Sequence, residues 1–271
     1  MNISLYQQDI CWLEPEANYK KIETVLNQLP ETDLLVLPEM CSTGFVTSPE
    51  AGQTEYFADV EQCLLDLSRR YQTALCGSFA VTLSPQREAA KNRQNNRNRC
   101  YFVTPEGELH HYDKHHLFHI GGERRGYEPG QEQCIVTWRG IRFFLVVCFD
   151  LRFPVWSRFA PNNSYDILIC VANWPQKRRL AWETLLPARA IENQVFVVGV
   201  NRVGEDDICV YDGGSRAILP MVISLPNVSM ARRVSVPSRP ICKNSRTFAE
   251  SSRVKPIPTD SPSLNGEDSA A

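Results

Sequence analysis

The sequence has no long hydrophobic run and no excess of charge of either sign. No apolar stretch approaches the roughly 20 residues that cross a bilayer, so the protein is not expected to span a membrane. The 29 Lys and Arg residues nearly balance the 31 Asp and Glu residues, for a net charge of −2. This balance gives no electrostatic reason to expect nucleic acid or an anionic membrane as a partner.

A secretory signal and paired cysteines are also lacking. Residues 1–4 have neither the basic start nor the following apolar run of a signal peptide, so we expect a cytoplasmic protein. None of the ten cysteines belongs to a C-x-x-C pair, and in a reducing compartment most should be free thiols. Those in apolar stretches are interpreted as core residues: Cys63, Cys76, Cys170 and Cys209. A chemical role for any one cysteine therefore needs separate evidence.

What the sequence does contain is enough apolar residues for a large core. Its 271 residues are 43% hydrophobic, which suits a single α/β domain. Periodicity predicts strands at 2–8, 34–37, 73–81, 100–104, 109–112, 135–138, 141–147, 167–172 and 195–200. It predicts helices at 15–29, 55–71, 155–160 and 180–193. This alternation, with hairpin turns at 105–108 and 139–140, predicts a layered α/β fold.

Two segments are polar enough to be placed outside the core. The stretch 86–99 is polar and basic, and we expect an exposed loop there. After Pro220 no sustained periodicity remains, and Ser and Pro recur. Such composition buries little apolar surface. We therefore expect a folded domain at 1–220 and a disordered tail at 221–271.

Three residues that could carry chemistry stand at the ends of apolar runs, where α/β sheets usually build their sites. Glu39 follows a predicted buried strand, and partial desolvation suits such a carboxylate to act as a base. Lys114 follows another strand, where a fixed ammonium could stabilise an oxyanion. Cys148 ends a strongly apolar strand and enters a polar turn, which would hold a nucleophile outward.

Each of the three has an ordinary explanation when it is taken alone. Glu39 could cap a helix, Lys114 could be solvated, and Cys148 could be an inert core thiol. A reactive thiolate needs a base or a cation nearby, and the other two segments provide both. The three in this order therefore form a much stronger signal than any one of them.

At these positions the sequence resembles the nitrilase superfamily of carbon–nitrogen hydrolases, and most closely its omega-amidase branch. The resemblance rests on Leu37-Pro38-Glu39-Met40, on Tyr112-Asp113-Lys114-His115-His116-Leu117-Phe118 and on Cys148-Phe149-Asp150-Leu151-Arg152-Phe153-Pro154. Ala172-Asn173-Trp174-Pro175 and the segment 188–193 support it. It implies a four-layer α-β-β-α sandwich, a homodimer, and hydrolysis of the terminal amide of a small 2-oxo acid to the acid and ammonia. The omega-amidase substrates are 2-oxoglutaramate and 2-oxosuccinamate, and the reaction needs no metal or organic cofactor.

The resemblance also implies a role for each matching residue. Glu39 corresponds to the general base, Lys114 to the oxyanion stabiliser and Cys148 to a nucleophile that forms a thioester. The backbone N–H of Phe149 would share the oxyanion. The family has a second glutamate seven residues before a Pro-Gly glycine, and Glu123 fits this spacing to Gly130, with Glu128 as the rival.

Two further residues are candidates for substrate binding. Arg152 lies four residues after Cys148, and a guanidinium there could bind the carboxylate of an oxo acid bidentately. The alternative is a structural salt bridge with Asp150 or Glu192. Trp174 follows a predicted buried strand and could line the substrate pocket, or it could pack in the core.

Two other functions remain open at this level. All five histidines fall between His110 and His119, at spacings that would place pairs on one face of a helix, as metal sites use. That pattern is typical of a metal-binding protein, although the flanking sequence predicts strand. From Met221 the sequence departs from the family, so the chain could instead be an inactive member with an altered tail.

Overall fold

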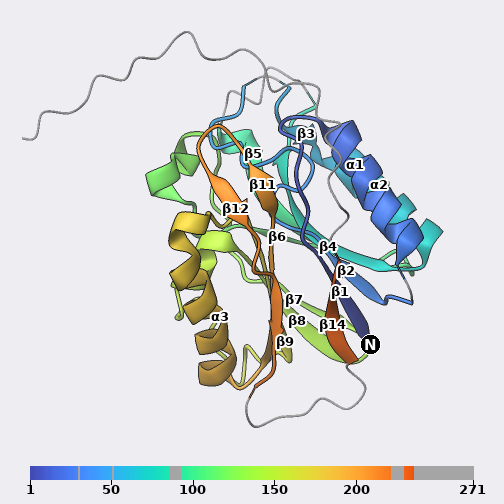
Figure 1. The fold of residues 1–271 in the computed structure, drawn as a ribbon, viewed down its shortest axis with the longest axis vertical. Helices are drawn as coiled ribbons and strands as arrows, with labels where there is room; N and C mark the ends of the chain where they lie inside the picture. The colour runs from blue at the N-terminus through green and yellow to red at the C-terminus, as the bar shows by residue number, and fades with distance from the viewer. Residues whose placement is uncertain (30, 51, 86–92, 221–228, 235–271) are drawn as a thin grey trace, which may run out of the picture. The chain divides into compact units, whose positions relative to one another are not determined.

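The computed structural model describes residues 1–29, 31–50, 52–85, 93–220 and 229–234. Within them, two mixed β-sheets pack face to face and helices cover their outer faces (Figure 1). The predicted four-layer α-β-β-α sandwich is confirmed. None of the helices in these ranges is long and apolar enough to cross a membrane.

The first sheet has the strand order β14-β1-β2-β4-β5-β6, with the short β3 paired to β4. Its strands are β1 (Asn2–Tyr6), β2 (Leu34–Val36), β3 (Glu55–Tyr56), β4 (Ala74–Thr82), β5 (Asn96–Val103), β6 (Leu109–Asp113) and β14 (Ser229–Val234). Strands β1, β2 and β4 are parallel, whereas β4, β5 and β6 are antiparallel. Helices α1 (Pro15–Gln28) and α2 (Phe57–Tyr71) pack on its outer face through Ile22, Val25, Val60 and Leu64.

The second sheet has the order β13-β10-β9-β8-β7. Its strands are β7 (Ile135–Trp138), β8 (Ile141–Val147), β9 (Ile167–Ala172), β10 (Phe196–Asn201) and β13 (Arg216–Ile218), and α3 (Arg179–Asn193) covers its outer face. Strands β8, β9 and β10 are parallel and nearly continuously apolar, as expected for strands buried on both faces. A separate hairpin joins β11 (Val203–Glu205) to β12 (Val210–Asp212).

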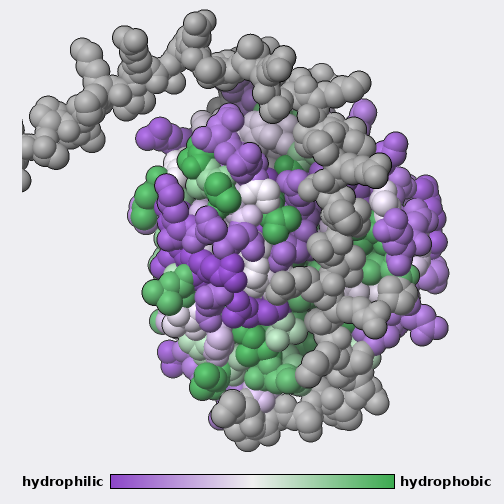
Figure 2. All heavy atoms as spheres, in the orientation of Figure 1, coloured by the Kyte–Doolittle hydropathy of each residue, from purple (hydrophilic) through white to green (hydrophobic). Residues whose placement is uncertain are grey.

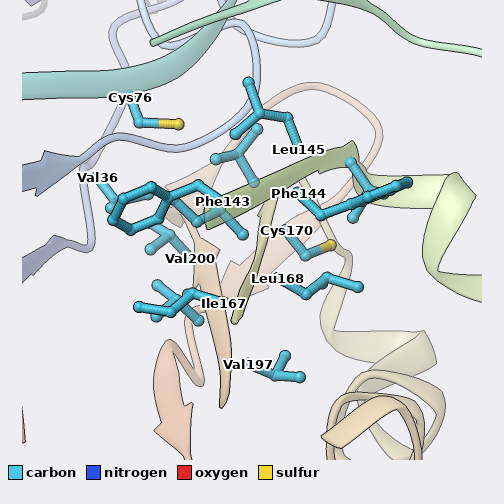
Figure 3. Close-up of a cluster of buried hydrophobic side chains, with 14 of the residues drawn as sticks. Val36, Cys76, Phe143, Phe144, Leu145, Ile167, Leu168, Cys170, Val197 and Val200 are labelled. Carbon is cyan, nitrogen blue, oxygen red and sulfur yellow. The ribbon is translucent and has the colours of Figure 1, made fainter. Parts of the chain in front are cut away.

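The core between the sheets is formed by side chains that alternate along these strands (Figure 3). Phe143 points from β8 toward the first sheet, where its ring lies 5.1 Å from that of Phe102. Its neighbour Phe144 points the other way, toward the α3 side, with Leu168 and Val197. Because period-two alternation fixes both faces of β8, the end of this strand is held in a defined register.

Most predicted elements are confirmed, and the hairpin at 139–140 has positive φ at both turn residues, Arg139 (50°) and Gly140 (75°). The helix expected at 155–160 is wrong. This segment forms turns, and the chain instead makes a one-turn 3₁₀ helix, η5 (Cys148–Arg152). Pro154 and Pro161 flank a stretch too short to nucleate a helix.

The loop expected at 86–99 is also wrong in part. Residues 86–92 lie outside the described residues, but β5 begins at Asn96 and continues through Arg99. Asn96 and Asn98 are fully buried, because their amides form hydrogen bonds inside the protein. These two polar residues belong to a buried hydrogen-bond network, and they are not exposed to solvent as the prediction assumed.

The expected tail falls mostly outside the described residues, at 221–228 and 235–271. Ser229–Val234 is an exception, because it forms β14 and pairs in parallel with β1. An edge strand is joined through backbone hydrogen bonds, which any sequence free of proline can form, so periodicity gave no warning of it.

The cysteine predictions hold for most residues. Eight of the ten cysteines are free thiols, and Cys76 and Cys170 are core residues as expected. Cys63 and Cys209 are only partly buried, which corrects their assignment to the core. Cys209 lies beside β12, between the two strands of the separate hairpin, and not in a sheet interior.

Candidate active site

Four side chains that the sequence singled out meet where strands of the two sheets end. Glu39 follows β2, and Lys114 follows β6 directly. Glu123 begins a short 3₁₀ helix, η4 (Glu123–Arg125), and Cys148 follows β8 directly. The two sheets therefore contribute different groups to one site.

Lys114 lies between two carboxylates. Its Nζ is 2.8 Å from Oε1 of Glu39, 2.8 Å from Oε2 of Glu123 and 3.1 Å from the other Glu123 oxygen. The side chains of all three residues are inaccessible to solvent. Burial opposes the charge on Lys114, but the charges of Glu123 and Glu39 outweigh this effect and hold its pKa well above the ordinary value.

Glu123 and not Glu128 completes this group. Burial raises the pKa of Glu123, and the charge of Lys114 opposes the rise. Its Oε2 also accepts the backbone N–H of Phe118 at 2.6 Å. Glu128 is partly exposed and lies 3.5 Å from Arg93. The position preferred from the spacing to Gly130 is the one that contacts Lys114.

Asn98 joins both carboxylates and was missed by sequence reasoning. Its Nδ2 donates to Oε1 of Glu39 and to Oε1 of Glu123, at 2.8 Å each. It projects from β5, in the stretch that was expected to be a loop. The alternation Asn96-Arg97-Asn98-Arg99 was the available signal, since period two is a strand pattern whatever the residue types.

The backbone of Asn173, which follows β9, fixes the other oxygen of Glu39. Its N–H donates to Oε2 of Glu39 at 2.8 Å, and its own side-chain Nδ2 donates to the Glu39 carbonyl oxygen at 2.8 Å. Glu39 thus has partners on both carboxylate oxygens and on its backbone. Its orientation is determined from both sheets.

Cys148 has an unusual backbone conformation for a residue with a side chain. Its φ is +46°, in the left-handed region, at the turn from β8 into η5. Such strain persists only where the surroundings enforce it, and it is common at functional sites. The Asp150 carboxylate enforces the turn, because it accepts the N–H of Val147 at 3.0 Å, the O–H of Tyr112 at 2.8 Å and the N–H of His116 at 2.8 Å.

The surroundings of the Cys148 thiol disfavour its ionised form. Burial raises its pKa well above the ordinary value, and the charge of Glu39 raises it further, while Lys114 lowers it. A hydrogen bond with Glu39 contributes in the same direction as burial. A nucleophile in this state needs a base, and Glu39 is in place to accept its proton.

A cavity of about 280 Å³ opens onto Cys148. Phe149, Arg152 and Trp174 line it, as expected for substrate-binding residues. Several further lining residues were missed, because the loops that bring them are distant in sequence: Trp12, Phe45, Phe118, Ile120, Arg178 and the segment 206–211. No short motif marks such a wall.

Arg152 makes neither of the salt bridges considered from the sequence. The Asp150 carboxylate instead accepts hydrogen bonds from Val147, Tyr112 and His116. Glu192 pairs with Arg189 at 2.7 Å. The Arg152 guanidinium instead lies over the ring of Trp174, 5.1 Å from its centroid. Among the residues that the structure describes, it has no ion-pair partner. An unpaired guanidinium therefore faces the cavity.

Trp174 has both of its expected roles. It lines the cavity, yet it is only 3% exposed and packs against Trp182, with ring centroids 5.4 Å apart. Its Nε1 donates to the carbonyl oxygen of Arg178 at 2.8 Å. This bond ties the second arginine of the cavity wall to the indole.

The histidine cluster does not have the geometry of a metal site. Its residues lie on β6, in the segment after it and at the start of the 3₁₀ helix η3 (His119–Gly121), and not on one α-helix, which the pairing would need. His115 Nδ1 lies 2.7 Å from the carbonyl oxygen of Gly130, and His116 Nδ1 lies 2.9 Å from Asp150. Within the described ranges no three His, Cys, Asp or Glu side chains gather to hold an ion.

Comparison with known proteins finds relatives of this chain in one family. The carbon–nitrogen hydrolase family model matches residues 2–232. The omega-amidase YafV of Escherichia coli strain K12 is 38% identical over 237 residues, covering 86% of this chain and 88% of that protein. The 2-oxoglutaramate amidase of Bacillus subtilis is 30% identical over 222 residues, covering 80% and 82%.

Solved structures of related proteins are also similar to this chain. A CN-hydrolase superfamily protein from Xanthomonas campestris, with an arsenic adduct in its active site, is 36% identical with a TM-score of 0.72, over 80% of this chain and 82% of that one. A variant of the Nesterenkonia amidase, to whose active-site cysteine acrylamide has added, is 25% identical with a TM-score of 0.70, over 80% and 85%. From its sequence, its fold and these relatives, the chain belongs to the carbon–nitrogen hydrolase family of the nitrilase superfamily.

Proposed function

We propose that the protein is an omega-amidase, which hydrolyses the terminal amide of a small 2-oxo acid such as 2-oxoglutaramate or 2-oxosuccinamate. One observation carries the proposal: the Cys148 thiol and Glu39 are both buried and both contact Asn173, and Glu39 shares Lys114 with Glu123. The nucleophile lines a small cavity, and the base and the cation are buried in contact with each other at the same site. The names of the relatives support the substrate class.

The proposed reaction begins with proton transfer from the Cys148 thiol to Glu39. The sulfur attacks the amide carbon, and the carbonyl oxygen becomes an oxyanion stabilised by Lys114 and the backbone N–H of Phe149. Glu39 returns the proton to the amide nitrogen, the C–N bond breaks, and ammonia leaves. A water, deprotonated by Glu39, then attacks the thioester, and the acid and the free thiol are released. Glu123 acts by holding Lys114 in place.

The substrate carboxylate is assigned to Arg152. A planar guanidinium matches a carboxylate with two parallel hydrogen bonds. Arg152 faces the cavity from the same 3₁₀ helix that carries Cys148, so the distance between anchor and nucleophile is fixed by one short element. The 280 Å³ cavity suits a small substrate.

Cys148→Ala should abolish ammonia release and leave the fold intact, because it removes the nucleophile at little cost in volume. The assay compares 2-oxoglutaramate, 2-oxosuccinamate, glutamine, asparagine and an aliphatic nitrile, with circular dichroism to confirm folding. Cys170→Ala, which removes another buried thiol that does not line the cavity, is the matched control and should retain turnover. Turnover by folded Cys148→Ala would disprove the mechanism, and a wild-type protein inert on the whole panel would disprove the function.

Lys114→Met should lower kcat by about 10²-fold or more, the usual loss for one oxyanion donor. It also leaves two buried carboxylates without their cation, which should cost about 3–5 kcal/mol of unfolding free energy near pH 7. The positive charge of Lys114 limits the rise in the pKa of Glu123. Without that charge, Lys114→Met should raise the pKa of Glu123 further.

A group whose pKa is raised in the folded state regains stability as the pH falls through that value. The deficit of Lys114→Met should therefore shrink in urea titrations as the pH is lowered from 7. Lys177→Met, at an exposed position, serves as the control. A deficit that is constant with pH, or a change confined to KM, would contradict the assignment.

Arg152→Met should lower kcat/KM for 2-oxoglutaramate by about 10- to 100-fold, the loss of a charged hydrogen-bond pair, with little change for a neutral amide such as propionamide. Arg152→Lys should also lose activity, because an ammonium cannot reproduce the planar fork. The same measurements on Arg178→Met test the other guanidinium of the cavity. Equal losses on both substrates would make Arg152 structural, and a selective loss only in Arg178→Met would move the carboxylate site there.

We also propose that the protein is a homodimer that uses the outer face of α3. Leu180 and Ile191 are 79% and 61% exposed, and their spacing of eleven residues places them on one side of the helix. Hydrophobic and hydrophilic side chains are mixed over this region (Figure 2). Light scattering should give twice the 30.8 kDa of one chain, and Ile191→Glu should give the monomer. A monomeric wild type would rule the dimer out.

A further inference from the structure

The amide of Asn98 has only one orientation compatible with its neighbours. Ser78 Oγ accepts the backbone N–H of Met40 at 2.9 Å, so its own O–H is available to Asn98 Oδ1, 2.8 Å away. With Oδ1 on this donor, both hydrogens of Nδ2 face the carboxylates of Glu39 and Glu123. The flipped amide would place an acceptor against two carboxylates.

Asn98 and Lys114 bind the two carboxylates from different directions. Each gives one contact to Oε1 of Glu39 and at least one to Glu123. Two carboxylates sharing one cation repel each other in a buried site, since none of these side chains reaches solvent. The two N–H groups of Asn98 are neutral donors that offset this repulsion without adding a second positive charge.

We propose that Asn98 is a positioning residue, oriented by Ser78, that holds Glu39 and Glu123 in place so that Glu39 stays aimed at the Cys148 thiol. The inference rests on the proposed amidase function. It adds Asn98 to the group formed by Glu39, Lys114, Glu123 and Cys148. Like the two carboxylates, Asn98 is not among the residues that line the cavity, and its side chain bonds Glu39, Glu123 and Ser78. The other titratable groups facing the pair are Lys114, Cys148 and Tyr127.

The test is the pH profile of Asn98→Ala, measured on the best substrate of the wild type. A misplaced base should lower kcat by about 10²-fold, while KM changes less than about threefold. A hydrogen bond from Asn98 lowers the pKa of Glu123. Its loss should move the acid limb of kcat/KM, which reports protonation of the coupled pair, upward by about one pH unit.

Two further variants make the result interpretable. Asn193→Ala removes another buried amide that both donates and accepts hydrogen bonds, but at the end of α3, so its acid limb should match the wild type. Ser78→Ala keeps Asn98 but frees its amide to flip, and it should shift the limb in the same direction by a smaller amount. It also carries the test if Asn98→Ala does not fold.

A folded Asn98→Ala with reduced stability but wild-type kcat and acid limb would overturn the proposal, as would a Ser78→Ala profile that matches the wild type when Asn98→Ala cannot be purified. Failure of the proposed function has a different signature, since the wild type itself would then release no ammonia from any amide of the panel.

Discussion

The buried contact of Lys114 with Glu39 and Glu123 is the constraint on which the rest of the site depends. Removing charges from water is costly, and an ion pair in the interior is tolerated only when its remaining polar atoms are bonded. Here the backbone N–H groups of Phe118 and Asn173 and the amide of Asn98 complete the shell. Because these donors come from both sheets and from the connecting loops, the sandwich must close before the ion pair can exist.

The same charges set the state of the nucleophile. A thiol beside a cation alone would ionise readily, but Cys148 is buried and also faces Glu39, and the combined effect raises its pKa. In the proposed mechanism the thiol stays neutral until its proton passes to Glu39. Because oxidation proceeds through the thiolate, a raised pKa also disfavours oxidation of such a thiol.

Sequence reasoning succeeded where chemistry and periodicity coincide. Glu39, Lys114 and Cys148 each follow an apolar run, so strand ends could be inferred and the three groups placed together. It failed for Asn98, because a polar residue in a polar stretch resembles a loop until its buried partners are known. It failed for Arg178 and Trp12, because a cavity wall is formed by long-range packing that no local pattern records. The helix expected at 155–160 failed because two prolines outweighed the apolar spacing.

The residues that were predicted lie mostly at strand ends, and the residues that were missed lie mostly in the cavity wall. The reacting groups sit at the ends of strands, whose register is fixed on both faces by the core. Most of the cavity wall comes from residues outside the two sheets, among them Trp12, Ile120 and the segment 206–209. Loops tolerate substitution without disturbing the core, so the wall can change while the ion pair is preserved. Arg152 is the exception, because it shares η5 with Cys148. Under the proposed function, an anchor on the same turn as the nucleophile would tie the choice of a carboxylate-bearing amide to the chemistry itself, and would leave the other wall residues to decide what else the substrate carries.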